Sequence, residues 1–246
     1  MELKRSAEGE KGFQKVFAFL RDRLLAGSLK PGDRLIAERE LASLLGVSRP
    51  IVREALRALT VLGIVEIRDR VGTVVTRPDV SVLNDFFTFA LAQHADMLDD
   101  VMQARVAIEC QAIRLACERA GIADFERLQR ALVQIEQTID EAEAGGMADF
   151  EFHRAIVLAS RSETLTVLHG SLGGLLTRSH RSRRELVQSF PSMKTYLIED
   201  HRRIFEAVIA RDPERADAAL RKHFAIGDEY RRRAVLGEKD VRKALR

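Results

Sequence analysis

Apolar side chains repeat at helical spacing on two short segments: Leu41, Leu44 and Leu45 in the first, and Val52, Ala55, Leu56 and Leu59 in the second. Gly46 separates the segments and has the backbone freedom that a tight turn needs. Ser48 is a favourable N-cap for the second segment, and proline at position 50 is tolerated in a first helical turn. The pattern predicts two helices joined by a turn, as in a helix-turn-helix.

The polar face of the second predicted helix carries a stripe of arginines. Arg49, Arg53 and Arg57 are spaced i, i+4 and i+8, so they lie on one side of the helix. Such a stripe is compatible with an ordinary solvated helical hairpin. It is also what a major-groove helix requires, because arginine makes bidentate contacts to guanine and ion pairs with phosphate.

The segments on either side favour the second interpretation. Residues 64–69 (IVEIRD) and 71–76 (VGTVVT) are short runs rich in β-branched side chains around an arginine-containing turn, which predicts a two-stranded hairpin. Upstream, apolar spacing predicts a first helix that ends near Gly27, before the Pro31-Gly32 pair. Helix, helix-turn-helix and hairpin together predict a winged helix-turn-helix.

The remainder of the chain reads as helices only. A short connecting helix is expected over residues 84–94, and longer ones over residues 97–120, 123–144, 147–160, 163–186, 193–211 and 213–235. Expected breaks include Gly121, the Gly145-Gly146 pair and Asp212-Pro213, where Asp212 would cap and Pro213 would occupy the first helical position. The fold class is therefore mainly α: an N-terminal winged helix-turn-helix followed by an antiparallel helical bundle.

Charge follows the same division. The first 80 residues hold 15 Lys and Arg against 11 Asp and Glu, a net of +4, whereas the remainder hold 25 against 26, a net of −1. The basic excess therefore lies in the expected DNA-binding part. No apolar run is long enough to span a membrane and no secretory leader is evident, so a cytoplasmic protein is expected. Cys110 and Cys117, about 10 Å apart along one helix, are expected to be reduced core residues.

Four residues of the helical part have metal-ligand chemistry. Asp149 and His153 are spaced i, i+4 on one expected helix, while His201 and His223 lie on two later ones. One carboxylate and three imidazoles can hold a divalent transition ion such as Zn, Ni, Mn or Fe and leave coordination positions open. Each histidine taken singly is more often an ordinary core or surface residue. Their joint presence on a helical bundle predicts a metal site.

The N-terminal pattern resembles a known family. The run PGDRLIAERELASLLGVSRPIVREALRALTVLGIVEIRDRVGTVV is similar to the DNA-binding domain of GntR-type bacterial transcription regulators, over about residues 12–77. The resemblance implies DNA contacts from Arg39, Arg49, Pro50, Ile51 and Arg53, and from the wing tip at Arg70 and Gly72. Ile36-Ala37 and Pro50-Ile51 depart from the commoner family residues, which affects the expected operator sequence but not the fold.

A second resemblance covers about residues 97–235. The segments DFEFH (149–153), EDH (199–201) and AVIARDPERADAALRKH (207–223) resemble the all-helical effector-binding domain of the FadR-type branch, the FCD domain. In its metal-binding members, the matching positions imply that Asp149, His153, His201 and His223 hold the metal. His94, His169 and His180 match no ligand position and are expected to be structural.

The same resemblance implies what the metal is for. Its open positions would accept the carboxylate of an effector, with Arg105 as the main candidate for pairing with the same anion and Arg178 as a second. We therefore expect a homodimeric, ligand-responsive DNA-binding regulator, commonly a repressor, with double-stranded operator DNA and a small organic or sugar acid as partners. The expected domains are residues 8–77 for DNA binding, 78–96 as linker and connecting helix, and 97–235 for effector binding and dimerisation.

Two other classes of protein share some of these features. A metal-dependent enzyme fused to a DNA-binding module would turn over a bound acid, but no nucleophile or base motif accompanies the four ligands. An architectural DNA-binding protein whose bundle only dimerises would bind neither metal nor a small molecule. The chain is expected not to be an enzyme.

Overall fold

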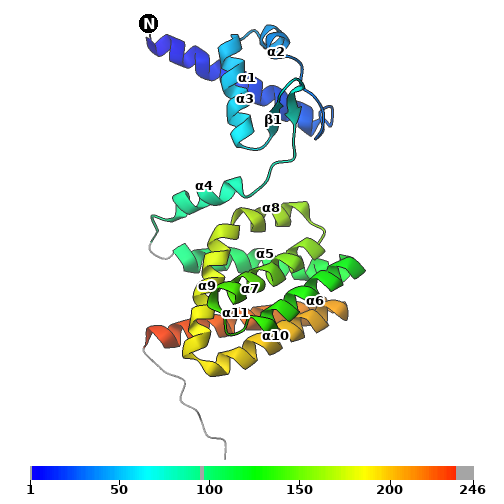
Figure 1. Ribbon diagram of the computed structural model, residues 1–246, viewed down its shortest axis with the longest axis vertical. Coiled ribbons are helices and arrows are strands. Elements are labelled where there is room, and N and C mark those ends of the chain that lie inside the picture. The colour runs from blue at the N-terminus through cyan, green and yellow to red at the C-terminus, as the bar shows by residue number, and fades with distance from the viewer. Residues whose placement is uncertain (1, 95–96, 237–246) are drawn as a thin grey trace, which may run out of the picture. The chain divides into compact units, whose positions relative to one another are not determined.

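The computed structural model describes residues 2–94 and 97–236, and its contacts divide it into two compact units with the boundary between Val82 and Leu83. The first unit, blue to cyan in Figure 1, contains three helices and a two-stranded sheet among the described residues: α1 (Glu2–Leu25), α2 (Glu38–Leu45), α3 (Arg49–Val61), β1 (Val65–Arg68) and β2 (Gly72–Val75). This order matches the predicted winged helix-turn-helix.

The turn between α2 and α3 is built as its sequence predicts. Gly46 ends α2 in the left-handed region, at φ 61°, and its N–H donates to the carbonyls of Ala42 and Ser43. Ser48 precedes α3 with extended backbone and makes no side-chain capping hydrogen bond. The inward faces of α1, α2, α3 and the hairpin share one apolar core: Val16, Leu20, Leu35, Leu41, Ala42, Val52, Ala55, Leu56, Leu59, Val65 and Val75.

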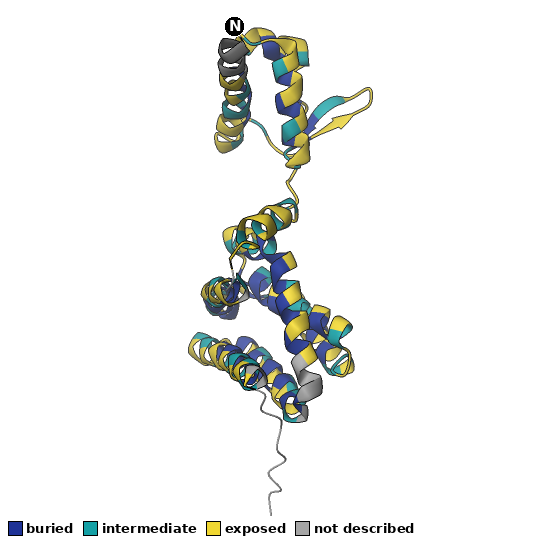
Figure 2. Ribbon diagram, turned by 90° about the vertical axis from the view of Figure 1, so that its left-hand side faces the viewer, coloured by how far each residue is buried: buried dark blue, intermediate teal, exposed yellow. Residues whose placement is uncertain are grey.

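The wing is an antiparallel hairpin that pairs Val65 with Val75 and Arg68 with Gly72. Arg70 and Gly72 at its tip both have positive φ, 61° and 98°. A backbone bridge from Arg34 to Val74 ties the segment before α2 to the outer side of β2. The valines at the hairpin base are buried while its tip is exposed (Figure 2), so the wing is anchored at one end only.

The second unit is helical throughout its described part (Figure 1): α4 (Val82–Leu91), α5 (Met97–Arg119), α6 (Ile122–Gln137), α7 (Ala142–Ala159), α8 (Glu163–Ser171), α9 (Gly173–Ser189), α10 (Pro191–Ile209) and α11 (Pro213–Val235). The expected connecting helix, α4, packs Phe87 and Leu91 against a cluster formed by α5 and the start of α9. It therefore belongs to the packing of the second unit.

Helix α7 is the centre of this unit and contacts α5, α6, α8 and α9. The prediction that Gly145 and Gly146 break the chain between two helices is wrong, since both lie inside α7. A Cβ on Gly146 would lie 2.9 Å from Cα of Arg181 on α9, and one on Gly145 would lie 2.7 Å from the Thr138 carbonyl oxygen. The glycines therefore allow close backbone approach, which outweighs their low helix propensity.

One further helix differs from the predictions. The helix expected over residues 163–186 is two helices, α8 and α9, which meet at Leu172. The break before α11 is as predicted, because Asp212 accepts a hydrogen bond from the Arg215 N–H and Pro213 opens the helix. Cys110 and Cys117 are buried free thiols, and burial raises the pKa of Cys110 to about 12. Within the described residues, no helix is both long and apolar enough to cross a membrane.

Candidate metal centre and nucleic-acid interface

The four predicted metal ligands meet inside the helical unit. Asp149 and His153 come from α7, His201 from α10 and His223 from α11, and all four are buried. One ligand atom from each lies within 4.8 Å of every other. Because transition ions bind such nitrogen and oxygen atoms at about 2.0–2.2 Å, two ligands of one ion are at most about 4.4 Å apart. The cluster is within a few tenths of an ångström of that span.

Hydrogen bonds outside the cluster orient two of the imidazoles. Nδ1 of His201 lies 2.6 Å from the Leu197 carbonyl oxygen, which can only accept, so Nδ1 carries the proton. Nδ1 of His153 lies 2.6 Å from Oε2 of Glu109 and donates to it in the same way. Both rings therefore present Nε2 to the cluster. Metal-binding histidines commonly have this arrangement, with the remote nitrogen held by a carbonyl or carboxylate.

The protonation states leave lone pairs facing one another. Burial lowers the pKa of His201, an effect that Asp149 opposes. Burial, together with the nearby His201 and His153, puts the pKa of His223 well below its usual value. Neutral His201 then points the lone pair of Nε2 at Oδ1 of Asp149 across 3.1 Å. Two acceptors at that distance repel unless a cation lies beside them, so the donor set fits a bound divalent ion.

The carboxylates at the site are ionised. Burial alone would raise the pKa of Asp149, but neighbouring histidines, His180 and His201 foremost, hold it well below its usual range. Burial would likewise raise the pKa of Glu109, and the charges of Arg105 and His153 hold it well below. In the described part of the chain, Nε2 of His223 has no hydrogen-bond partner at all. A buried polar atom is seldom left in that state without a functional reason.

Arg105, the main candidate for holding an effector, is fully buried beside the cluster. Its Nε donates to Oε1 of Glu109 at 2.7 Å, and its guanidinium lies 4.7 Å from the centre of the Phe224 ring. Its Nη2 has no hydrogen-bond partner among the described residues. Arg105 is therefore paired within its own helix and keeps a free donor.

The structure does not bring Arg178 to the cluster: its side chain is exposed on α9. Two other arginines of that helix, Arg183 and Arg184, are buried there instead, with Nε of Arg184 at 3.5 Å from Oδ2 of Asp149. Arg183 and Arg184 follow His180 at i+3 and i+4, so the three residues lie on one face of α9. The same helical spacing relates Asp149 and His153 on α7.

Two of the histidines expected to be structural also lie at the site, whereas His94 is exposed. Nδ1 of His180 is 3.3 Å from Oδ1 of Asp149, and Nε2 of His169 is 3.3 Å from Oε1 of Glu109. Burial lowers the pKa of His180 to about 3, so its ring is neutral. The resemblance to the FCD domain assigned no ligand role to His169 or His180, so their presence at the site was not predicted from the sequence.

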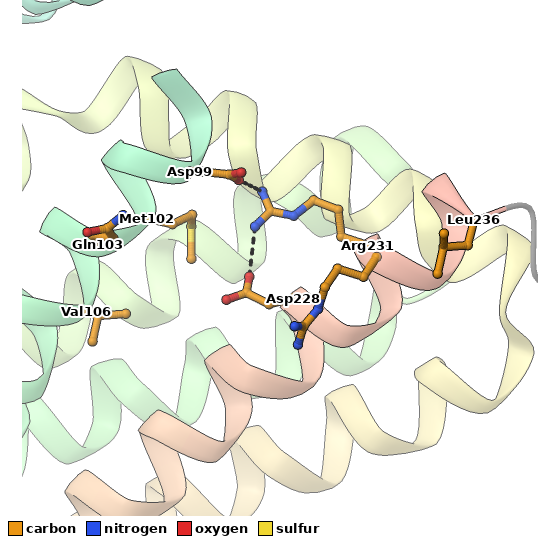
Figure 3. Close-up of a pocket in the computed structure, with 8 residues that line it drawn as sticks. Asp99, Met102, Gln103, Val106, Asp228, Arg231 and Leu236 are labelled. Atoms are coloured by element: carbon orange, nitrogen blue, oxygen red, sulfur yellow. Dashed lines mark hydrogen bonds and ion pairs between the residues drawn. The ribbon is translucent and has the colours of Figure 1, made fainter. Parts of the chain in front are cut away.

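A hollow of about 660 Å³ opens between α5 and α11 (Figure 3). Arg231 spans it with ion pairs of 2.8 Å to Asp99 and 2.9 Å to Asp228. Met102 lines the hollow and also contacts Arg105, with Sδ 4.0 Å from Nη1. A single side chain thus touches both this hollow and the buried guanidinium.

In the first unit, the start of α3 carries the predicted DNA-facing residues. Arg49, Pro50 and Arg53 are exposed and, with Glu54 and Arg57, line a surface hollow of about 610 Å³. Nη2 of Arg53 lies 3.4 Å from Oε2 of Glu38, an exposed pair of the kind that contributes little to stability. Ile51 is half-buried: a Cβ on Gly12 of α1 would lie 3.1 Å from its side chain.

The other predicted DNA contacts lie on α2 and the wing. Arg39 and Arg70 are exposed, and Gly72 is half-buried behind the hairpin tip. A Cβ on Gly72 would lie 3.4 Å from Nε of Arg34, so the Arg34 guanidinium stands beside the wing. Sequence reasoning did not single out Arg34, because its place next to the wing depends on the backbone bridge to Val74.

Comparisons with known proteins agree with this two-part arrangement. Residues 13–75 match the family model described as bacterial regulatory proteins, gntR family, and residues 100–225 match the model described as the FCD domain. The first match covers the winged helix-turn-helix. The second covers the helices that supply all four candidate metal ligands.

Individual relatives match over most of their length. The "HTH-type transcriptional regulator LutR" of Bacillus subtilis (strain 168) is 34% identical over 198 residues, 80% of this chain and 90% of the relative. The "Putative L-lactate dehydrogenase operon regulatory protein" of Escherichia coli (strain K12) is 31% identical over 205 residues, 81% of this chain and 78% of the relative. The solved structure "Streptococcus agalactiae GntR" has a TM-score of 0.65 at 23% identity, covering 91% and 99% of the two chains, and is similar in fold.

Proposed function

This chain belongs to the gntR family of bacterial regulatory proteins, and from that premise we propose that it is a metal-dependent, effector-responsive repressor of transcription. Its family and relatives are transcription regulators rather than enzymes, in agreement with the sequence-based expectation. The proposal has three parts: operator binding by α3 and the wing, a divalent ion at the histidine cluster, and a small organic acid as effector.

Operator binding rests on the arginines at the start of α3. Arg49 and Arg53 are exposed where a recognition helix enters the major groove, and Arg70 projects from the wing tip. Arg39 and Arg34 add positive charge near the same elements. Because the one ion pair of Arg53 with a described residue is its exposed pair with Glu38, the cost of redirecting its guanidinium to a base or phosphate is small.

The observation that carries the metal proposal is the contact between His201 and Asp149. Nε2 lies 3.1 Å from Oδ1 while Nδ1 is committed to the Leu197 carbonyl, so neutral His201 would present one acceptor to another. Asp149, His153, His201 and His223 would hold the ion, and Glu109 orients His153. When bound, the ion would supply positive charge and open coordination positions to an anionic ligand.

The effector class follows from the arginine next to the ligands. Nη2 of Arg105 is a buried donor with no partner in the described structure, and a carboxylate is the group that a guanidinium binds most strongly. Glu109 fixes the other edge of Arg105, so its free donor is already oriented when a ligand arrives. We infer a small organic or sugar acid that reaches Arg105 past Met102 from the hollow in Figure 3.

The response to effector would be a shift between states of a homodimer. A winged helix-turn-helix dimer reads two half-sites about 34 Å apart, one helical turn of DNA. An effector that binds one dimer arrangement more tightly shifts the population towards it and changes operator affinity by the ratio of its two affinities. In a repressor, the arrangement that effector favours is the one that does not match successive major grooves.

A direct experiment is to identify what copurifies with the protein. Elemental analysis would give the metal per chain, and mass spectrometry of the denatured protein's supernatant would identify any released acid. The proposal expects close to one equivalent of a divalent transition ion, with loss of that ion in His223→Ala but not in His94→Ala. A protein that takes up no such ion, even after incubation with Zn²⁺, Ni²⁺ or Mn²⁺ and desalting, would contradict the proposal.

A further inference from the structure

With a divalent ion bound, more positive charge would be buried around the histidine cluster than one effector carboxylate neutralises. Three guanidinium groups are buried there, those of Arg105, Arg183 and Arg184. The buried carboxylates near them are Glu109 and Asp149. An ionised side chain that leaves water without a partner loses much of its solvation energy, so each buried guanidinium needs an anion or several acceptors.

Two of the three buried arginines have hydrogen-bond or ion-pair partners. Arg105 is paired with Glu109 at 2.7 Å. Arg183 donates from Nη2 to the Phe224 carbonyl oxygen at 3.1 Å and lies 3.7 Å from Asp228, whose side chain reaches the surface. Asp200, the remaining buried carboxylate that faces this region, pairs with Arg203 at 2.8 Å. None of these contacts involves Arg184.

Arg184 is the exception. Its side chain is 1% exposed, and its only ion pair among the described residues is the 3.5 Å contact of Nε with Oδ2 of Asp149. Nε, Nη1 and Nη2 all lack a hydrogen-bond partner in the described part of the chain. Asp149 is also one of the proposed metal ligands and is shared with three histidines. When a metal ion is bound, the negative charge of Asp149 therefore interacts mainly with the ion rather than with Arg184.

The neighbour of Arg184 on the same face of α9 is in a similar state. His180 is fully buried, and neither ring nitrogen has a hydrogen-bond partner within the described residues. Gly145 leaves room for the arginine, since a Cβ there would lie 3.4 Å from Nε of Arg184. The chain thus maintains a buried guanidinium and a buried imidazole that both lie within 3.5 Å of Asp149 but make no hydrogen bond among the described residues.

We propose that the effector is a dicarboxylic acid, with one carboxylate held by Arg105 and the second by Arg184 together with His180. This inference rests on the proposed function and specifies the class of ligand for the same site. A second anion would give Arg184 the bidentate partner that it lacks, and would reduce the net positive charge of a site with three guanidinium groups and a divalent ion.

The free volume of the cavity at the site limits how a dicarboxylate can bind. The cavity bounded by Asp149, Arg184 and His223 has about 10 Å³ of free volume, no more than one water molecule needs. A dicarboxylate must therefore displace side chains as it enters. Tyr196 of α10 lines the same cavity and is 46% exposed, which makes it the side chain best placed to move.

The test compares acids that differ only in the second carboxylate. Calorimetric titrations of the full-length, Zn²⁺-loaded protein would use the dicarboxylates malonate, succinate, glutarate and adipate, each against the monocarboxylate with the same number of carbons. The proteins would be the parent, Arg184→Met, and Arg178→Met as a matched control, because Arg178 is an exposed arginine of the same helix. Arg184→Lys keeps the charge and serves as a second variant if Arg184→Met does not fold.

We expect the best dicarboxylate to bind the parent at least about tenfold more tightly than its matched monocarboxylate, a difference of about 1.4 kcal/mol. Arg184→Met should abolish this preference and keep monocarboxylate binding, Arg184→Lys should reduce it, and Arg178→Met should leave it unchanged.

Equal affinity for both classes of acid, or a preference that survives in Arg184→Met, would overturn the dicarboxylate inference and leave the proposed function intact. If neither class of acid binds the metal-loaded parent, the proposed effector class itself fails.

Discussion

Nδ1 of His153 lies 2.6 Å from Oε2 of Glu109, 44 residues earlier in the chain. The same carboxylate accepts Nε of Arg105 at 2.7 Å through its other oxygen. Glu109 therefore connects a proposed metal ligand on α7 to the proposed effector-binding arginine on α5. Any change in Arg105 that moves Glu109 is transmitted to the ring orientation of His153.

Replacing Glu109 by Gln should weaken metal binding about 10–100-fold, the usual effect of removing a group that orients a ligand histidine. The amide is close in shape but no longer an anionic acceptor for Nδ1 of His153. Competition with a chromogenic chelator would measure the affinity for Zn²⁺. Glu118→Gln, at an exposed position of the same helix, is the matched control. Unchanged affinity in Glu109→Gln would show that the carboxylate does not orient a metal ligand.

His201→Ala should lose stoichiometric metal and with it the stabilisation that metal confers. An ion bound only by the folded state stabilises it by about 2.7 kcal/mol at 100 times its Kd. The melting temperature of the parent should therefore rise with added Zn²⁺, and that of His201→Ala should not. His94→Ala, a surface substitution in the same unit, should behave as the parent. A variant without His201 that keeps one metal per chain would remove this residue from the ligand set.

The parts of this fold that could be predicted from sequence are those set by local pattern. Helical spacing of Leu41, Val52 and Leu56, with the turn at Gly46, was sufficient for the helix-turn-helix. The i, i+4 pair of Asp149 and His153 indicated a ligand site, and the structure brings His201 and His223 to it. The resemblance to the FCD domain indicated that these distant residues lie together, which their spacing in the sequence alone does not determine.

What could not be predicted depends on contacts between helices. Gly146 was predicted to break the helix because glycine has a low intrinsic helix propensity. In the structure it lies within α7, where the absence of a side chain leaves room for the close approach of Arg181 from α9. The importance of His180 and Arg184 was missed for the same cause, because their burial depends on how α9 packs against α7. Arg178, equally basic and in the same segment, is exposed on another face of α9.

Arg53→Ala should weaken operator binding by about 1–3 kcal/mol and relax sequence preference at the base it reads, while the helical unit stays folded. The operator would be recovered by selection from random duplexes, and affinity measured by fluorescence anisotropy at fixed ionic strength. Arg154→Ala, an exposed arginine of α7, is the control for a lost positive charge. If Arg53→Ala binds the selected duplex as tightly as the parent, α3 does not read the operator as proposed.

Asp124→Asn should destabilise the helical unit by about 1–3 kcal/mol at neutral pH. Asp124 is buried at the start of α6, where Oδ2 accepts the Gly121 N–H at 3.0 Å and an Arg161 donor at 2.6 Å. Burial alone would raise the pKa of Asp124, but these hydrogen bonds and that with Arg127 lower it. Because the folded pKa is the lower one, the stabilisation exists above the unfolded value of about 4 and is lost as pH falls.

Urea titrations of parent and Asp124→Asn from pH 7 down to pH 3 would measure this effect. The difference in the free energy of unfolding should be largest at neutral pH and should shrink as the parent's carboxyl becomes protonated. Asp140→Asn, at an exposed position after α6, should show no comparable difference. A constant difference across the pH range would mean that the charge of Asp124 is not what stabilises this helix start.

The central claim is that an anion at the metal site controls DNA binding through Arg105. Its most direct test is operator binding by the metal-loaded protein as a function of effector concentration, for the parent and Arg105→Ala side by side. The effector would be the acid that copurifies, or the tightest of the titrated acids. The parent should lose operator affinity as effector is added, and operator should lower effector affinity by the same factor. With metal supplied at a saturating concentration, Arg105→Ala should still bind the ion and should bind operator as the parent does, but it should not respond to effector. A variant that still responds at the parent's effector concentration would contradict the claim.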